Sequence, residues 1–413
     1  MLSQANNELL CRSGPGTPFG QLARRYWLPA MRASALPAGG APKRLRLLNE
    51  NYVLFRAADG RIACFDEACP HRGVSLTLAR SGDNALTCIY HGWKIDVSGR
   101  VLDTPNEPPA RREKFAASIP VRRLPVREAG GVIWVWPGEL PAAPFPAFEF
   151  NTLPAGHVLT LRGYARSNWL QGMESALDSS HLGILHQSAI RASTVKSVGE
   201  LQKTLDLVPG FEVEAMPYGL KEAALRTLPD GAQYVRVREV VLPFFNFIPM
   251  PAGATGTMFC FVPIDDHHHA QWLFYYRADR PVDPKEVLQP DAGASYDDFA
   301  MGVGDAGNGW NQDRAQMEAG HWSGLPGIVP VEDIAVTESM GPIVDRSKEH
   351  LGSSDVVVAR TRQRLLEMIR DAHPGMGDAT EYECIRAIAL RCRDIDWRAI
   401  DAFAPPPDLA TAS

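Results

Sequence analysis

The sequence lacks several features that would assign it to common classes of protein. It has 413 residues but only seven cysteines, an odd number spread over the chain, so a disulfide framework is not indicated. The formal net charge is −6, which offers no concentrated positive surface for nucleic acid or for anionic lipid. No basic segment followed by an apolar stretch begins the chain, so we expect no secretory signal and a cytoplasmic location.

The sequence also lacks a hydrophobic run that could form a continuous membrane-spanning helix. Residues 240–264 carry no charge and are long enough to cross a bilayer, but prolines and glycines interrupt them, and a continuous helix does not tolerate that. We therefore expect buried strands beside a cavity. The expected wall of that cavity is aromatic and apolar: Phe244, Phe245, Phe247 and Met250.

The pattern of apolar and turn residues changes along the chain and predicts two domains. Residues 1–26 have a helical, amphipathic pattern, and residues 27–138 consist of short apolar runs around turn residues, as in a β-domain. Residues 139–150 are rich in proline and are predicted to be a linker. Residues 151–413 mix strand-like and helical stretches, so the predicted fold class is α+β, with an antiparallel sheet and helices following an all-β domain.

Four residues in the first domain have the spacing of an iron–sulfur site. The motif is Cys-x-His, sixteen intervening residues, then Cys-x-x-His, at Cys69, His71, Cys88 and His91. In a Rieske [2Fe–2S] cluster two thiolates bind one iron and two imidazoles bind the other. Zinc fingers usually pair Cys with Cys and His with His, whereas each pair here is mixed, so zinc is the weaker interpretation.

A second group of metal-binding residues lies in the second domain. Asp178, His181 and His186 form D-x-x-H-x-x-x-x-H, and two histidines with one carboxylate hold mononuclear Fe(II) with positions open for dioxygen. Five residues on an ideal helix turn about 500°, so His181 and His186 would diverge. We therefore predict that the helix is irregular at Gly183. Asp178 is close to His181 in sequence, and we expect it to bond that histidine rather than the metal.

Both motifs resemble those of the Rieske non-haem iron aromatic-ring hydroxylating oxygenases, in the subgroup of phthalate and phenoxybenzoate dioxygenases. The resemblance implies a helix-grip catalytic domain with one cluster and one mononuclear iron per chain. It also implies a distal aspartate as third ligand, which falls at Asp333 in Glu-Asp-x-Ala-Val, with Asp345 as the alternative. It further implies a homotrimer or a dimer of trimers, in which Asp178 carries electrons from the cluster of one chain to the iron of its neighbour.

The chain contains no motif for binding a flavin or a nicotinamide. Electrons are therefore expected from a separate NAD(P)H-dependent flavin and iron–sulfur reductase. The resemblance implies hydroxylation, and in this subgroup dihydroxylation, of an aromatic carboxylate with dioxygen. O-demethylation of a methoxybenzoate and simple electron transfer remain alternatives.

Several side chains are candidates for binding a substrate carboxylate. Tyr234, Arg236 and Arg238 share one face of a predicted strand, where the arginines either meet the cavity or point to solvent. The other candidates are Ser179, Lys221 and Arg226. The triplet His267–His269 is predicted to be a solvated turn without a metal.

Overall fold

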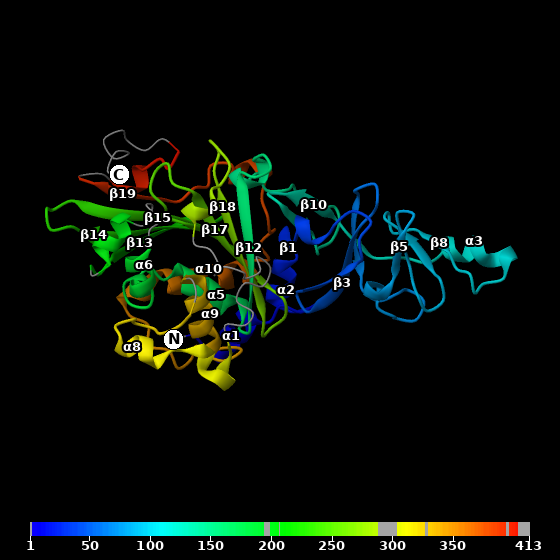
Figure 1. The fold of residues 1–413 in the computed structure, drawn as a ribbon, viewed down its shortest axis with the longest axis horizontal. Coiled ribbons are helices and arrows are strands. Elements are labelled where there is room, and N and C mark those ends of the chain that lie inside the picture. The colour runs from blue at the N-terminus through cyan, green and yellow to red at the C-terminus, as the bar shows by residue number, and fades with distance from the viewer. Residues whose placement is uncertain are drawn as a thin grey trace.

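The computed structural model describes residues 2–193, 199–205, 207–287, 304–326, 329–393 and 396–403. The molecule is elongated, with a small β-rich domain at one end and a larger domain of sheet and helices at the other (Figure 1). This arrangement confirms the α+β class and the order of the two parts.

The N-terminal domain consists of small antiparallel sheets. Its strands are Leu28–Arg32 (β1), Lys43–Leu47 (β2), Glu50–Arg56 (β3), Ile62–Asp66 (β4), Arg80–Gly82 (β5), Ala85–Thr87 (β6), Lys94–Asp96 (β7), Val101–Asp103 (β8), Arg123–Leu124 (β9), Val126–Ala129 (β10) and Val132–Val135 (β11). They form the sheets β2-β3-β4-β9, β5-β6-β7-β8 and β1-β11-β10. Gly60 and Gly99 both have a φ of 89° at the turns of the hairpins β3–β4 and β7–β8. Glycine adopts this left-handed conformation without strain, and this explains the tight connections.

One curved antiparallel sheet organises the second domain. Its strands are Val158–Ala165 (β12), Gly210–Met216 (β13), Gly219–Thr227 (β14), Gln233–Val241 (β15), Phe245–Ile248 (β16), Gly256–Pro263 (β17), His269–Tyr276 (β18) and Ile388–Cys392 (β19). The strand order is β12-β18-β17-β16-β15-β14-β13, and β19 pairs with β15.

Helices cover one face of this sheet (Figure 1). The α-helices among the described residues are Gln4–Cys11 (α1), Pro18–Ala23 (α2), Pro109–Ala117 (α3), Glu149–Thr152 (α4), Trp169–Leu177 (α5), Gln187–Ala192 (α6), Gly199–Thr204 (α7), Arg314–Glu318 (α8), Val329–Ser339 (α9) and Val356–Arg370 (α10). The central helix α5 packs against β16, β17 and β18, and α9 packs against α5. This packing brings α5 and α9, which are far apart in sequence, side by side.

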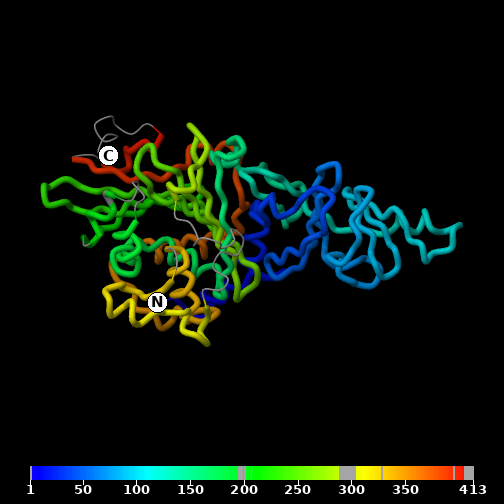
Figure 2. Tube along the Cα trace, in the orientation of Figure 1, coloured from blue at the N-terminus to red at the C-terminus, as the bar shows by residue number. Residues whose placement is uncertain are grey.

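The N-terminal segment forms two short helices rather than one. Ser3 caps α1, and Thr17 caps α2, which begins at Pro18. A proline is tolerated in the first turn of a helix but not in its interior, so the helical pattern divides there. Both helices contact α10, and Figure 2 shows the N-terminus against the larger domain rather than the β-rich one.

Phe244, Phe245 and Phe247 are core and not cavity wall, which corrects that part of the prediction. Met250 of the same run does line the cavity, as expected. Phe245 lies opposite Val241, and Phe247 lies opposite Glu239, so both occupy the sheet face away from Arg238. The Phe148 ring is 5.2 Å from that of Phe245. Phe148 and Phe150 are fully buried, so the end of the predicted linker 139–150 is anchored in this core. Phe244 instead packs on Phe19, Tyr26 and Trp169.

The histidine triplet is only partly the solvated turn that we expected. His267 is exposed and His268 contacts Asp265, but His269 begins β18 and is buried. Burial lowers the pKa of His269 to about 4, so the ring is neutral. Its Nδ1 bonds the carbonyl oxygen of Ser167 at 2.8 Å.

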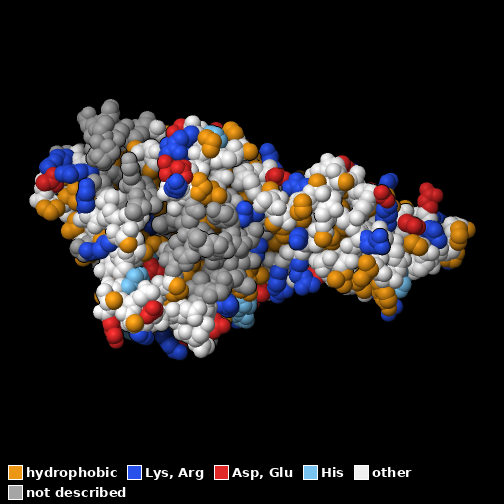
Figure 3. Space-filling view, in the orientation of Figure 1, with side chains coloured by type: hydrophobic (Ala, Val, Ile, Leu, Met, Phe, Trp, Pro, Cys, Tyr) orange, Lys and Arg blue, Asp and Glu red, His pale blue; other side chains and the backbone are white. Residues whose placement is uncertain are grey.

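Two observations on the described residues concern membrane-spanning helices and surface charge. Within the described ranges, no helix combines the length and the hydrophobicity needed to cross a bilayer. On the face in Figure 3, acidic and basic side chains are mixed over both domains.

Candidate metal centres

The two loops that carry Cys69, His71, Cys88 and His91 have the same backbone hydrogen bonds. The amide of Cys69 donates to Val74 and that of Cys88 donates to Trp93, at 2.8 and 2.9 Å. Gly73 and Gly92 have φ values of 78° and 74°, so each loop turns where a side chain would be strained. The two cysteine–histidine pairs are therefore presented by two equivalent turns.

The chemistry of these four residues fits a [2Fe–2S] cluster. Both cysteines are buried, whereas His71 and His91 are partly exposed, with ring centroids 4.5 Å apart. Burial and the neighbouring Cys88 raise the pKa of Cys69 to about 11, so the thiolate forms when a metal supplies the positive charge.

The second group of ligands is assembled where α5 ends. Asp178 caps the helix, and its Oδ1 accepts a 2.6 Å hydrogen bond from the Ser180 amide. A 3-10 turn over His181–Gly183 follows, and α6 begins only at Gln187. A Cβ at Gly183 would lie 2.2 Å from the Leu205 carbonyl oxygen, so only glycine fits. The predicted irregularity is confirmed, and close packing explains the glycine.

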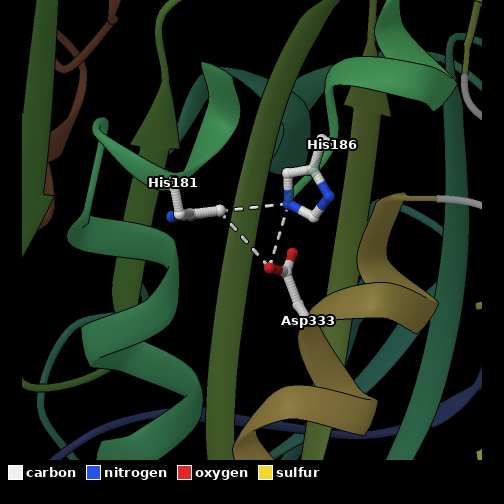
Figure 4. A group of neighbouring side chains, drawn as sticks. All are labelled: His181, His186 and Asp333. Carbon is white, nitrogen blue, oxygen red and sulfur yellow. Dashed lines mark hydrogen bonds and ion pairs between the residues drawn. The ribbon is translucent and has the colours of Figure 1, made fainter. Parts of the chain in front are cut away.

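This break lets His181 and His186 face each other and Asp333 of α9 (Figure 4). The two Nε2 atoms are 3.0 Å apart, and Asp333 Oδ1 is 3.1 Å from His186 Nε2 and 3.4 Å from His181 Nε2. Metal–ligand bonds of about 2.1 Å give about 3.0 Å between neighbouring ligands at right angles, and about 3.4 Å in a tetrahedron. Two of the three distances match one face of an octahedron, the arrangement of a 2-His-1-carboxylate site.

The charges at this site also suit a cation. Burial opposes protonation of His181, but hydrogen bonds to Asp178 and Asp333 outweigh it and raise the pKa to about 9. Burial would favour the neutral acid of Asp333, yet the two imidazoles hold its pKa well below the usual range. Among the described residues, His181, His186 and Asp333 are the one group that converges as a single-ion site. Asp345 is exposed and bonds Ser347 and Lys348 instead.

A cavity of about 130 Å³ opens beside these three residues. A cavity of about 150 Å³ admits benzene, so the space suits a single ring. Its polar lining includes Asp178, Arg236 and Arg238. The apolar lining comes from several elements: Ala176, Leu182, Ile190, Leu201, Ile248, Met250, Phe259 and Val287.

Comparisons with known proteins agree with both centres. Residues 26–125 match the Rieske [2Fe-2S] domain, and residues 136–404 match the family described as LigXa C-terminal domain like. The chain belongs to the Rieske non-haem iron oxygenases. It therefore carries a Rieske cluster and a mononuclear iron site, and it is an oxidoreductase.

Relatives of this Rieske oxygenase include dioxygenases and a demethylase. The chain is 35% identical to the 3-chlorobenzoate-3,4-dioxygenase oxygenase subunit of Comamonas testosteroni, over 95% of this chain and 96% of the relative. It is also 35% identical to the phthalate 4,5-dioxygenase oxygenase subunit of Pseudomonas putida, over 97% and 95%. A 5,5'-dehydrodivanillate O-demethylase oxygenase subunit of a Sphingobium strain is 29% identical, over 89% and 80%.

A solved structure shows the same fold for this Rieske oxygenase. Dicamba monooxygenase bound to dicamba superimposes with a TM-score of 0.59 at 18% identity, over 85% of this chain and 99% of that one.

The predicted substrate-binding residues of the oxygenase separate into two groups. Arg236 and Arg238 are buried and line the cavity, so the alternative that they point to solvent is wrong. Arg226 is buried behind them and donates to the backbone carbonyls of Ser179 and Leu207. Lys221 lies opposite Glu239, on the other face of the sheet from the cavity.

The two cavity arginines differ in their partners. Arg238 is 3.2 Å from Glu222 and donates to Ser179 Oγ at 3.0 Å, so its charge is partly balanced. Arg236 is 5% exposed, and it forms no hydrogen bond or ion pair with another described residue. The buried Glu222 carboxylate is attracted by Arg236 as well, but its short contact is with Arg238. A buried guanidinium without a hydrogen-bonded anion is costly, so Arg236 retains donors that a further anion could satisfy.

Three polar residues around the oxygenase centre were missed in the sequence. Glu332 bonds His186, Ser175 donates to Asp333, and Glu222 pairs with Arg238. The position of Glu332 beside Asp333 was an available signal. Glu222 and Ser175 become visible only when the strands and helices are placed in space.

Proposed function

We propose that this chain is the terminal oxygenase of a multicomponent system that hydroxylates an aromatic carboxylate with a single ring, with dihydroxylation of the ring as the expected reaction. In this proposal Cys69, His71, Cys88 and His91 hold the cluster, and His181, His186 and Asp333 hold the mononuclear iron. The observation that carries the substrate class is the unpaired Arg236 in the cavity next to these ligands. A carboxylate would satisfy it with two parallel hydrogen bonds.

The residues of the chain have separate tasks in this reaction. When bound, the cluster would relay electrons received from a separate reductase, and the mononuclear iron would supply the activation of dioxygen. Arg236 orients the ring through its carboxylate, while Ile248, Met250 and Phe259 exclude water from the remainder of the cavity. Asp178 accepts the Nδ1–H of His181 at 3.3 Å and fixes the orientation of that ligand.

We further propose that electrons enter from outside the chain and cross between subunits. The cluster loops lie in the β-rich domain and the iron ligands in the larger one, at opposite parts of an elongated molecule (Figure 1). A homotrimer or dimer of trimers would bring the cluster of one chain near Asp178 of another. Leu78, Ile89 and Tyr90 are more than half exposed around the cluster loops, which suits contact with a separate reductase or a neighbouring subunit.

Metal analysis tests the two centres together. We expect about three iron atoms and two acid-labile sulfides per chain, two irons from the cluster and one from the His181 site. Iron and sulfide are measured on the anaerobically purified protein. An iron-to-sulfide ratio of one would contradict the second centre.

The substrate class is tested with a surrogate reductase and a panel of benzoates, phthalate isomers, phenoxybenzoates and methoxybenzoates. We expect hydroxylated products from the single-ring acids by mass spectrometry, with the two-ring phenoxybenzoates and the uncharged ring analogues turned over poorly. The O-demethylase relative favours the second candidate reaction, loss of formaldehyde from a methoxybenzoate. Oxidation of neutral rings in preference to every acid would refute the aromatic-acid proposal.

Replacing Arg236 with leucine should lower kcat/KM for the acid substrate about 10- to 100-fold, because a hydrogen bond to a charged group contributes about 1.5–3 kcal/mol. Most of the loss should appear in KM. Lys221→Leu is the matched control, since it removes a cation from the neighbouring strand on the opposite face. Equal losses of kcat/KM in the two variants would show that the effect comes from the change in net charge and not from a contact between Arg236 and the substrate.

A further inference from the structure

Helix α9 presents two consecutive carboxylates to the same histidine. Asp333 reaches Nε2 of His186, and Glu332 reaches Nδ1 of the same ring at 2.7 Å. His186 is fully buried and Glu332 is 1% exposed. The Ser323 hydroxyl donates to the other oxygen of Glu332. Glu332 is thus a buried carboxylate held by two donors, and one of them is a proposed metal ligand.

The second histidine is held less firmly. Asp178 is 3.3 Å from His181 Nδ1, and both side chains are partly exposed, at 27% and 20%. A carboxylate in a dry environment interacts more strongly with its partner than one near water. Of the two histidines, His186 therefore has the tighter outer support.

We propose that Glu332 is a positioning residue of the mononuclear metal centre: it holds the Nδ1–H of His186 so that the Nε2 lone pair faces the metal. This inference rests on the proposed assignment of His181, His186 and Asp333 as ligands. A carboxylate on the outer nitrogen fixes the tautomer of a ligating histidine and makes it a better donor. With Asp333, Glu332 also balances the two charges of a divalent ion in a buried site.

Metal affinity tests this role without reference to turnover. We expect Glu332→Gln, which keeps a hydrogen-bond acceptor, to weaken Co(II) binding about 10-fold, and Glu332→Leu to weaken it about 100-fold, the range found for outer-shell partners. The metal-depleted protein with its cluster intact is titrated anaerobically with Co(II) against a competing chelator. The visible bands of bound Co(II) should also change in Glu332→Leu, because the ring of His186 is no longer fixed.

Glu338→Gln provides the matched control. Glu338 is a buried carboxylate on the same helix, but it accepts from the Arg166 amide and the Trp310 indole and does not touch a histidine. Its variant should bind Co(II) like the wild type, and sulfide content and cluster absorption should stay constant in all variants. Wild-type affinity in Glu332→Leu, or an equal loss in Glu338→Gln, would overturn the inference alone. The ligand assignment itself predicts that the wild type binds Co(II) and that Asp333→Ala does not. If the wild type bound no Co(II), or if Asp333→Ala bound it equally well, that assignment would be overturned.

Discussion

Replacing Asp178 with asparagine is expected to lower turnover at least about 100-fold while both iron centres stay filled. A factor of about 100 is the upper end of what the hydrogen-bond partners of metal-binding histidines contribute to activity. Asparagine keeps the shape of the side chain, and its carbonyl oxygen can still accept from the Ser180 amide. It loses the negative charge beside His181 Nδ1, on the proposed route of electrons into the iron. The loss should therefore be one of electron delivery and ligand orientation.

The measurement has two parts, because turnover alone does not separate these roles from loss of metal. Iron and sulfide content should match the wild type, and product formed per chain in a single turnover of pre-reduced protein should fall with the steady-state rate. Ser180→Ala is the control, since the bond to Asp178 uses the amide and not the hydroxyl. If Asp178→Asn formed as much product as the wild type in a single turnover, the proposed role of Asp178 in electron transfer between subunits would be wrong.

The parts of the structure that could be predicted depend on local chemistry. The hairpins around Gly60 and Gly99 follow from turn residues between alternating runs, and the two loops that carry the proposed cluster ligands follow from the Cys-x-His and Cys-x-x-His spacing. The break at Gly183 followed from geometry, because His181 and His186 diverge on a regular helix. The reason why a glycine is required at this break could not be predicted, because the Leu205 carbonyl that packs against Gly183 belongs to a later segment of the chain.

The errors arose where tertiary packing decides the outcome. Strand β14 is difficult to predict from sequence, because Gly219–Thr227 contains alanine, lysine and glutamate, which are weak strand formers. Pairing with β13 and β15 on its two edges stabilises it. The register between β15 and β16 decided which face the aromatic run occupies, and a shift of one residue would have reversed it. For the same reason Arg236 was ambiguous in the sequence, although its face is clear in the sheet.

The choice between Asp333 and Asp345 shows why a third ligand is difficult to derive from sequence. The two histidines are linked by a short loop, but the carboxylate comes from α9, more than a hundred residues later. In the sequence only the family resemblance, through Glu-Asp-x-Ala-Val, favours Asp333 over Asp345. In the structure the distinction is clear. Asp333 is within 3.1 Å of His186 Nε2, and its Oδ1 also accepts from Ser175. Asp345 bonds only nearby residues of its own exposed loop among its described contacts.

Asp333→Ala should consequently lose the mononuclear iron and with it all product formation, while the cluster remains. The iron count should fall from about three to about two per chain, with sulfide unchanged, because two imidazoles alone leave a divalent ion without its charged ligand. Asp345→Ala removes an aspartate of equal size from the same region, and it should keep three irons and full turnover. If Asp345→Ala lost the iron and Asp333→Ala kept it, the assignment of Asp333 of α9 as the third iron ligand would be wrong. Because the cluster is read out in the same samples, a general failure to fold would appear as loss of sulfide and would not be mistaken for loss of a ligand.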